Sequence, residues 1–284
     1  MQQRSAIFLA VSLFAVAFAA GCVGQAPQAG VGDIAVRAIA DPPQIRPYES
    51  MTLFIDVENV GQLDVKNLAV DLFDAGLLSV AEGPGPLPWH PCVKEFPELR
   101  HAQVESLECK LTFTNPELLI KSVTPVELAI RTTFTKNISS TVAIEMLSLD
   151  ELRRLERIGR LEPKPQSYTF GDGQLQATLQ FQRQPPFLAG DTVIAQLSVR
   201  NVGPGYIGTL EPRNFLISQS DPSGRIFTCA FDAPLYSYNG IFPPITCILA
   251  VPSEIPTAAT YPITLVLGYD YELRQSVPVS IAKP

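Results

Sequence analysis

The chain of 284 residues is poor in basic side chains, and this shortage limits its partners. It has 21 Lys and Arg against 28 Asp and Glu, which gives a net charge of −7. Binding to duplex nucleic acid needs a basic face that displaces counterions. An anionic membrane surface attracts clustered Lys and Arg, and the sequence has no such cluster. We therefore expect no nucleic-acid partner.

Motifs for catalysis are also missing. The sequence contains no Gly-x-Ser-x-Gly, no His-Glu-x-x-His and no phosphate-binding loop. Its only two histidines, His90 and His101, fall in one segment. A Ser-His-Asp triad would have one place to form, without the sharp turn that presents its serine. The sequence predicts a protein that is not an enzyme and uses no cofactor.

Long apolar runs are absent beyond the amino terminus. There, Ala6–Ala20 follows the positive Arg4 and precedes Gly21-Cys22. Fifteen residues are short for a bilayer span and typical of a signal-peptide core. Ala19-Ala-Gly-Cys22 resembles the lipobox of prokaryotic lipoproteins, which implies that Cys22 becomes a lipidated first residue. Cleavage without lipid and an uncleaved anchor are the alternatives.

The amino-terminal pattern predicts where the protein works. Residues 1–22 are expected to be the signal peptide with its lipobox-like cysteine. Residues 23–32, rich in Gly, Gln, Ala and Pro, are expected to be a flexible tether. We therefore expect a lipid-anchored protein on the extracellular face of the cytoplasmic membrane, at the cell surface.

One stretch of the sequence occurs twice. Leu53–Gly61 (LFIDVENVG) returns as Ala195–Gly203 (AQLSVRNVG), an alternating segment that ends in the same Asn-Val-Gly. Alternation with a period of two indicates half-buried strands, and 26 prolines and 18 glycines suit many short strands joined by turns. The sequence therefore predicts an all-β protein with two copies of one module, at residues 33–147 and 167–284.

The segment after the first copy of the repeat gives the module a family resemblance. Glu58-Asn-Val-Gly61 followed by Val65–Phe73 (VKNLAVDLF) resembles the CARDB-type immunoglobulin-like domains of archaeal and bacterial surface proteins. The resemblance implies two tandem immunoglobulin-like β-sandwiches. The second copy departs from the pattern after Asn-Val-Gly, with Pro204-Gly-Tyr-Ile-Gly-Thr209.

The end of the first module contains a candidate modification site. Strands are expected at residues 126–135 and 141–147, on either side of a hairpin at Lys136-Asn-Ile-Ser139. Asn137 begins an Asn-x-Ser sequon there, which makes it a candidate N-glycan acceptor in an exported protein.

A short helix is expected between the modules, in a linker of residues 148–166. Ser148-Leu-Asp-Glu151 matches a capping box, and Gly159 suits the end of the helix. Four apolar residues share one face of it: Leu149, Leu152, Leu155 and Ile158. We expect a strut that packs on a module and sets the angle between the two. A helix that binds a membrane or a partner is the alternative.

Four cysteines remain besides Cys22, and they repeat as the modules do. Cys92 and Cys109 lie 17 residues apart, and Cys229 and Cys247 lie 18 apart. Four thiols in an exported protein indicate two disulfides, and the duplication selects these two pairs. Because His90 and His101 lie beside the first pair, a zinc or copper site is the alternative. The second module has the cysteines without any histidine, so we predict no metal.

The loops tied by the cysteines carry aromatic residues. Loops on a rigid sandwich often carry recognition, and aromatic rings stack on sugars or anchor protein partners. Capping of the open ends of the sandwiches is the alternative role. The candidate ligand-binding residues are Trp89, His90, Phe96, His101, Tyr236, Tyr238 and Phe242, with Phe231 nearby.

Together these features predict a non-catalytic cell-surface lipoprotein that acts as a binding, adhesion or structural module of the envelope. One alternative is a carbohydrate-binding accessory protein that uses the aromatic residues of the loops. Another is a subunit of a surface filament or envelope complex. In each case the expected partners are the membrane, through the lipid anchor, and a protein or a glycan.

Overall fold

The structure is a computed structural model that describes residues 28–29, 34–61, 64–85, 92–119, 121–219 and 226–283. The predictions for residues 1–22, including Cys22, and for Trp89 and His90 lie outside this range. Within the predicted tether, Gln28–Ala29 form the short strand β1, which pairs with β2. Among the described residues, no helix has the length and apolar character needed to cross a membrane.

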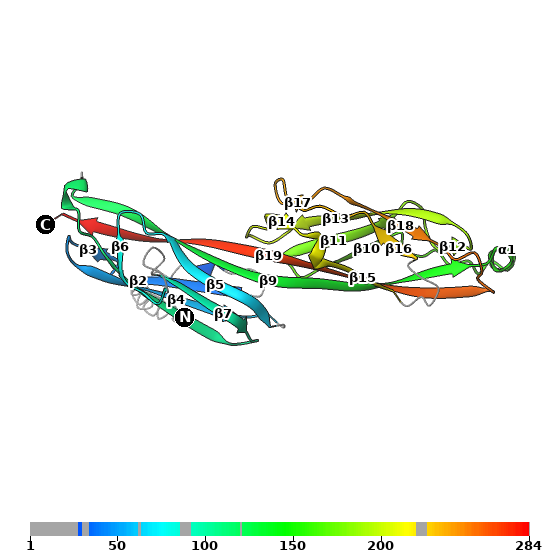
Figure 1. Ribbon diagram of the computed structural model, residues 1–284, viewed down its shortest axis with the longest axis horizontal. Helices are drawn as coiled ribbons and strands as arrows, with labels where there is room; N and C mark the ends of the chain where they lie inside the picture. The colour runs from blue at the N-terminus through cyan, green and yellow to red at the C-terminus, as the bar shows by residue number, and fades with distance from the viewer. Residues whose placement is uncertain are drawn as a thin grey trace, which may run out of the picture.

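The protein consists largely of β-strands, arranged in two halves that lie end to end along an elongated molecule (Figure 1). Each half has a five-stranded sheet of its own. In the first half the order is β1, β2 (Ile34–Asp41), β4 (Ser50–Asn59), β8 (Val104–Thr112) and β6 (Ser79–Glu82). In the second half it is β10 (Ser167–Gly171), β11 (Leu175–Phe181), β13 (Thr192–Asn201), β18 (Ile245–Ala250) and β16 (Phe227–Cys229).

A seven-stranded sheet runs through both halves. Its main path is β15 (Phe215–Gln219), β19 (Ala258–Ala282), β9 (Val123–Leu147), β5 (Val65–Asp74) and β7 (Val93–Leu99). Two short strands add to it in parallel, β12 (Phe187–Leu188) beside β9 and β3 (Gln44–Ile45) beside β19. A two-stranded sheet joins β14 (Thr209–Leu210) to β17 (Leu235–Tyr236), and the 3-10 helices are η1 (Pro116–Leu118) and η2 (Pro212–Asn214). Buried side chains of the three larger sheets belong to one hydrophobic core.

The two halves exchange strands. β9 and β19 are 25 residues long each and pair antiparallel over their whole length, from Val123 opposite Ala282 to Leu147 opposite Ala258. β9 starts beside β5 in the first half and ends beside β12 in the second. β19 starts beside β15 in the second half and ends beside β3 in the first. Each repeat therefore contributes the end of its last strand to the other half (Figure 1).

The exchange has an approximate two-fold symmetry. Buried residues recur in the two long strands at the same spacing, so that Leu128 corresponds to Ile263 and Ile130 to Leu265. This correspondence maps Thr135 onto Asp270, and these two residues lie directly opposite each other. The centre of the symmetry is therefore the pair in which Thr135 Oγ1 donates a hydrogen bond of 2.8 Å to Asp270 Oδ1.

The predicted hairpin at residues 136–139 is wrong, because this segment is the interior of β9. Asn137 is exposed, but it lies on a strand opposite Gly268 rather than at a hairpin tip. Tight hairpins need positive φ at their central residues, which Asn-Gly adopts readily and a β-branched residue does not. Ile138 occupies that place, and in the structure its side chain is buried. Use of Asn137 as a glycan acceptor stays a prediction.

The predicted helix forms but does not connect the two halves. α1 spans Leu149–Arg157, and the Ser148 hydroxyl accepts a hydrogen bond of 3.3 Å from the Glu151 amide, as the capping box predicts. Gly159 ends it with φ +62°. α1 lies at the outer end of the second half, where it joins β9 to β10 (Figure 1), and none of its residues is buried. The prediction of a strut between modules is wrong, because β9 has already crossed into the second half before α1 begins.

The repeated Asn-Val-Gly has the same structure in both halves. Asn59 Oδ1 accepts a hydrogen bond of 3.0 Å from the Gly61 amide, and Asn201 Oδ1 accepts one of 3.1 Å from Gly203. The other end of each amide side chain donates to a backbone oxygen, that of Leu99 at 2.9 Å and that of Gly205 at 2.6 Å. Each asparagine therefore holds the turn that ends its strand, which explains why the sequence repeats it.

Candidate functional site

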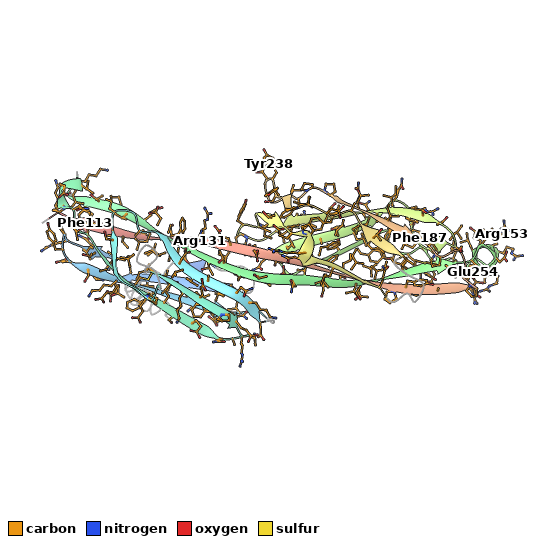
Figure 2. The ribbon with its side chains drawn as sticks, viewed as in Figure 1. Phe113, Arg131, Arg153, Phe187, Tyr238 and Glu254 are labelled. Carbon is orange, nitrogen blue, oxygen red and sulfur yellow. A yellow bond between two sulfur atoms is a disulfide. The ribbon has the colours of Figure 1, made fainter. Side chains whose placement is uncertain are left out.

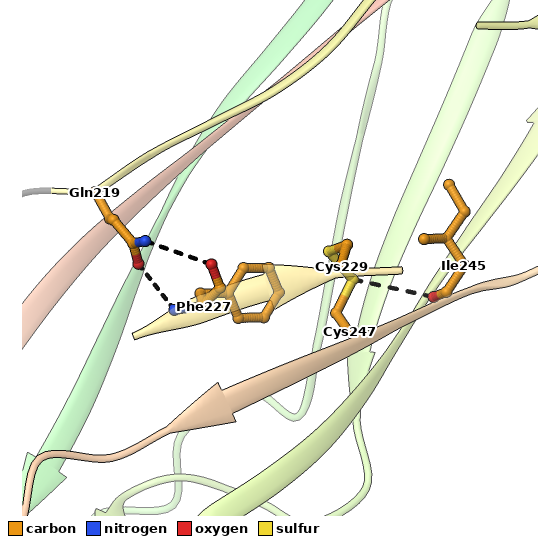
Figure 3. Close-up of a disulfide and its surroundings, with 5 residues drawn as sticks. All are labelled: Gln219, Phe227, Cys229, Ile245 and Cys247. Atoms are coloured by element: carbon orange, nitrogen blue, oxygen red, sulfur yellow. Dashed lines mark hydrogen bonds between the residues drawn. A yellow bond between two sulfur atoms is a disulfide. The ribbon is translucent and has the colours of Figure 1, made fainter. Parts of the chain in front are cut away.

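Both predicted disulfides are present. Cys92, just before β7, is bonded to Cys109 in β8, with Cα atoms 5.7 Å apart. Cys229 in β16 is bonded to Cys247 in β18, with Cα atoms 3.9 Å apart (Figure 3). These bonds use the thiols that a zinc or copper site would need. They also indicate an extracytoplasmic protein, because disulfides persist in oxidising compartments.

The two disulfides differ in what they join. Cys109 lies opposite Leu53 and Cys247 opposite Ala195, which are equivalent positions of the repeat. Their partners are not equivalent. Cys92 links the five-stranded sheet of the first half to the edge of the seven-stranded sheet, whereas Cys229 lies on the neighbouring strand of the same sheet as Cys247. The duplication therefore holds for the second cysteine of each pair and not for the first.

Several of the predicted aromatic residues belong to the core. Phe96 is 7% exposed and Phe242 is 3% exposed, so neither presents its ring to a ligand. Phe231 is also buried, and its ring centroid lies 5.8 Å from that of Phe215. His101 is exposed, its amide donates to Asp64 Oδ1 at 3.1 Å, and its ring Nδ1 contacts the Gly61 carbonyl oxygen. The three phenylalanines therefore contribute to the hydrophobic core.

Tyr236 and Tyr238 are instead on the surface, with 70% and 81% of their areas exposed. The structure brings further large exposed side chains close to them in the fold. The group, which we call the aromatic surface, comprises Val202, Tyr206, Tyr236, Tyr238 and Ile241. Figure 2 shows Tyr238 at the tip of a loop that projects from the long axis of the molecule, at the end of the second half that faces the first half.

Backbone pairing assembles the aromatic surface from three segments. Tyr236 pairs with Thr209 in the small sheet, and Ile241 pairs with both Tyr238 and Arg200. The Tyr206 ring lies over Gly208, where an added Cβ would be 3.1 Å from the ring. Sequence reasoning missed Val202, Tyr206 and Ile241. The sequence pattern that could have indicated Tyr206 and Ile241 was weak. Tyr206 is a single tyrosine in a Pro/Gly-rich stretch, and Ile241 follows an Asn-Gly pair.

The loop that carries Tyr238 is held rigidly. Tyr238 and Ile241 exchange backbone hydrogen bonds of 2.9 and 3.0 Å around Asn239-Gly240, whose φ values of +52° and +75° suit a two-residue hairpin turn. The Asn201 amide donates to the Gly240 carbonyl oxygen at 2.7 Å. On the other side, the Ser237 hydroxyl donates to the Ile207 carbonyl oxygen at 2.8 Å. The backbone that carries the exposed rings is therefore held in one conformation by hydrogen bonds.

A buried polar cluster lies where the strands cross between the halves. Lys136 Nζ is 2.7 Å from Asp172 Oδ2, and the Tyr269 hydroxyl donates to the same oxygen at 2.5 Å. Asp172 Oδ1 accepts hydrogen bonds from the amides of Gln174 and Leu175, at 3.1 and 3.0 Å. Asp172 therefore stabilises the turn between β10 and β11 and ties it to β9.

The charges of this cluster suit a structural role. Burial alone would raise the pKa of Asp172, but hydrogen bonds from Lys136, Tyr269 and the Leu175 amide outweigh burial and lower it. Asp172 is thus a carboxylate at neutral pH, with both oxygens occupied. Nearby, burial raises the pKa of Tyr271, whose hydroxyl accepts a hydrogen bond of 2.7 Å from the Gly205 amide. Within the described residues, no three His, Cys, Asp or Glu side chains form a group able to hold a metal ion.

Comparison with known proteins gives no family. No protein-family model matches the chain, and no curated protein matches it in sequence. Among solved structures, a protein of unknown function from Porphyromonas gingivalis W83 aligns with a TM-score of 0.24 and 14% identity, over 77% of this chain and 84% of that one. The secreted serine protease VesC from Vibrio cholerae aligns with a TM-score of 0.18 and 9% identity, over 82% of this chain and 48% of that one. Alignments this weak carry no argument about function.

Proposed function

We propose that the protein is a non-catalytic binding module of the cell surface, anchored through a lipid on Cys22 and built from two immunoglobulin-like β-sandwiches. The observation that carries the proposal is the aromatic surface, in which Tyr236 and Tyr238 are 70% and 81% exposed on a hydrogen-bonded framework. Scattered exposed apolar residues are ordinary, but a group of large exposed side chains that backbone pairing brings together is typical of an interaction site.

The energetics of such a surface suit binding. Tyrosine presents a large apolar ring with two side-chain torsions, so it loses little conformational entropy when a partner covers it. Residues of this kind are enriched among those that contribute about 2 kcal/mol or more to binding. The hydrogen-bonded hairpin at Asn239-Gly240 lowers the entropy loss further, because little of the loop backbone is left to be ordered on binding.

A carbohydrate is the second candidate partner. The faces of exposed tyrosine rings stack on sugar rings, and the hairpin adds the Asn239 amide as a hydrogen-bonding group beside Tyr238. A protein partner would use the same rings as anchors in a pocket. With a carbohydrate partner the aromatic surface would bind a polysaccharide, and with a protein partner it would bind an envelope protein. The same set of variants tests both.

The test compares Tyr238→Ala and Tyr236→Ala with Tyr48→Ala. Tyr48 is 73% exposed but lies on the first half, so its loss controls for removal of an exposed tyrosine. Binding is measured by affinity electrophoresis in gels that contain envelope polysaccharides, and by pull-down of envelope proteins. We expect Tyr238→Ala to weaken binding at least tenfold and Tyr48→Ala to leave it unchanged. Equal binding by all three variants would contradict the proposal.

A further inference from the structure

The edge of the seven-stranded sheet differs between the two halves. In the first half β5 pairs with β9 on one side and with β7 on the other. Its counterpart β15 pairs with β19, and within the described residues it has no second neighbour. Val70 of β5 lies opposite Thr132, and Phe215 of β15 lies opposite Leu267. Because the two-fold relation maps Thr132 onto Leu267, β5 and β15 occupy equivalent places in the sheet.

The first half shows how this edge is closed. β7 runs antiparallel to β5 and places Phe96 and Leu99 in the core. The disulfide from Cys92 to Cys109 fastens the start of β7 to the opposite sheet. In the second half the equivalent of Cys109, Cys247, bonds to Cys229 of its own sheet instead (Figure 3). The disulfide of the first half therefore fastens an edge strand of the seven-stranded sheet, whereas the disulfide of the second half does not.

The edge of β15 also lacks the features that prevent pairing. β7 is itself an edge strand, and it carries Lys94, Glu95, Pro97 and Glu98, which discourage a further strand. β15 reads Phe-Leu-Ile-Ser-Gln, without a charge or a proline. Leu216, in its middle, is 61% exposed. An uncharged and apolar edge strand is a site for pairing with another chain.

A cavity accompanies the open edge. It has a volume of about 280 Å³ and lies between β15 and β16. Its lining includes Phe215, Phe227 and Phe231. At one end, the Gln219 side chain bridges the two strands, accepting a hydrogen bond of 2.8 Å from the Phe227 amide (Figure 3). A strand added beside β15 would therefore have room for apolar side chains on its inward face.

We propose that the edge of β15 pairs with β15 of a second copy of this chain, in an antiparallel arrangement centred on Ile217. That arrangement has the same direction as the pairing of β7 with β5. It sets Leu216 of one copy opposite Ser218 of the other and Phe215 opposite Gln219. No charged residue of β15 faces another, so pairing involves no charge repulsion within the strand. The seven-stranded sheets of two molecules then form one continuous sheet.

The size of the contact sets its expected strength. A ladder of five residues is short, so we expect its buried area to lie below the roughly 1,200 Å² of stable interfaces. We therefore expect a dimer with a Kd on the order of 10–100 µM in solution. Anchoring to a membrane would concentrate the copies and restrict their orientation, so such a weak contact would suffice for assembly there.

Sedimentation velocity of the full chain between about 1 and 300 µM tests the proposal, over the range that brackets the expected Kd. Leu216→Lys places a charge on the edge without disturbing the core, and Leu118→Lys makes the same change at a leucine that is 50% exposed on η1. We expect wild type and Leu118→Lys to form dimers at high concentration and Leu216→Lys to stay monomeric. Wild-type protein that is monomeric throughout, or a Leu216→Lys variant that associates like wild type, would overturn the proposal.

Cysteine pairing tests the register. In the proposed dimer, Leu216→Cys combined with Ser218→Cys places two pairs of thiols opposite each other, whereas either single variant does not. We expect covalent dimers in the double variant, with a 216–218 link between copies in peptide mass maps. A dimer without this link would reject pairing through β15. The outcome is separate from that of the proposed function, because Tyr238→Ala is expected to leave dimerisation intact.

Discussion

Removal of the Asp172 charge tests how the turn between β10 and β11 is held on β9. Asp172→Asn keeps the Oδ1 atom that accepts hydrogen bonds from Gln174 and Leu175, and removes the negative charge beside Lys136. The Lys136 side chain is only 5% exposed, so its ammonium loses its carboxylate partner at a buried site and keeps the weaker hydrogen bond of 3.3 Å to Gln174 Oε1. Breaking a buried ion pair from one side costs about 3–5 kcal/mol. Because the Asp172 side chain is 19% exposed, we expect the lower end, about 3 kcal/mol.

A double-mutant cycle separates this effect from a general loss of packing. Lys136→Met removes the cation but leaves Asp172 hydrogen-bonded to Tyr269 and to two amides, so we expect a cost of about 2 kcal/mol. In the double variant neither charge is left unpaired. Its cost should be about 2 kcal/mol as well, well below the sum of the single changes.

The assay is urea unfolding followed by circular dichroism, at neutral pH and with both disulfides intact. The change in the unfolding free energy comes from the shift of the midpoint at constant slope. A cost below about 1 kcal/mol for Asp172→Asn, or additive costs in the cycle, would refute the interpretation of the cluster as a buried ion pair.

The same carboxylate gives a pH dependence. Its pKa in the folded protein is lowered from the ordinary value of 3.8, so its stabilising effect is complete above that value. The effect is lost as the pH falls below 3.8 through the folded pKa. Wild-type protein should therefore lose stability more steeply than Asp172→Asn as the pH falls through this window. Parallel profiles of unfolding free energy against pH for the two proteins would contradict this assignment.

Three further predictions concern the framework. In Gly205→Ala the new methyl group would clash with the Tyr271 ring and the Glu272 carbonyl oxygen. The unfolding free energy should therefore fall by about 2 kcal/mol or more, and an unchanged urea midpoint would contradict the geometry. Gly240→Ala strains a residue with φ +75°; we expect a loss of about 1 kcal/mol and weaker binding at the aromatic surface, measured by urea unfolding and affinity electrophoresis against Tyr48→Ala. Paired replacement of Cys92 and Cys109 by serine should lower the unfolding free energy by about 3 kcal/mol, because the bond closes a loop of 17 residues. The unfolding free energies of reduced and oxidised wild-type protein should differ by at least this amount.

The sequence predicted what local patterns encode. The strands of the repeat were visible because their alternation has a period of two, and the Asn-Val-Gly turn was visible because its asparagine bonds to its own backbone. The cap at Ser148 and the stop at Gly159 were predictable for the same reason. Both disulfide pairs were predicted from the similar spacings, although Cys92 and Cys229 are not structurally equivalent.

The exchange of strands could not be predicted from local patterns. The alternation in residues 140–147 fits a strand beside residues 126–135 as well as one beside β19, because both neighbours offer the same kind of apolar face. The choice depends on which pairing satisfies the whole sheet, and on the lack of a turn-forming residue at Ile138. The location of α1 followed from that choice and was therefore missed as well.

The aromatic residues were predicted only in part. Tyr236, Tyr238 and Phe242 are close in the sequence, yet two of them are exposed and one is buried. The hairpin at Asn239-Gly240 decides this, since it reverses the chain and turns Phe242 toward the core. Tyr206 joins the group only through tertiary pairing, with its backbone bonded to Glu272 at 2.8 and 2.9 Å.

Disulfide trapping across the exchanged strands tests the central claim most directly. One variant combines Ala129→Cys with Ser276→Cys, a directly opposite pair in the first half, and a second combines Ser139→Cys with Val266→Cys in the second half. With β9 and β19 passing through both halves, each variant should form its new disulfide within one chain, as mapped by peptide mass spectrometry of the monomer. If residues 126–135 instead folded back on residues 140–147, residues 129 and 276 would not meet. A folded monomer without the 129–276 bond would contradict the exchange.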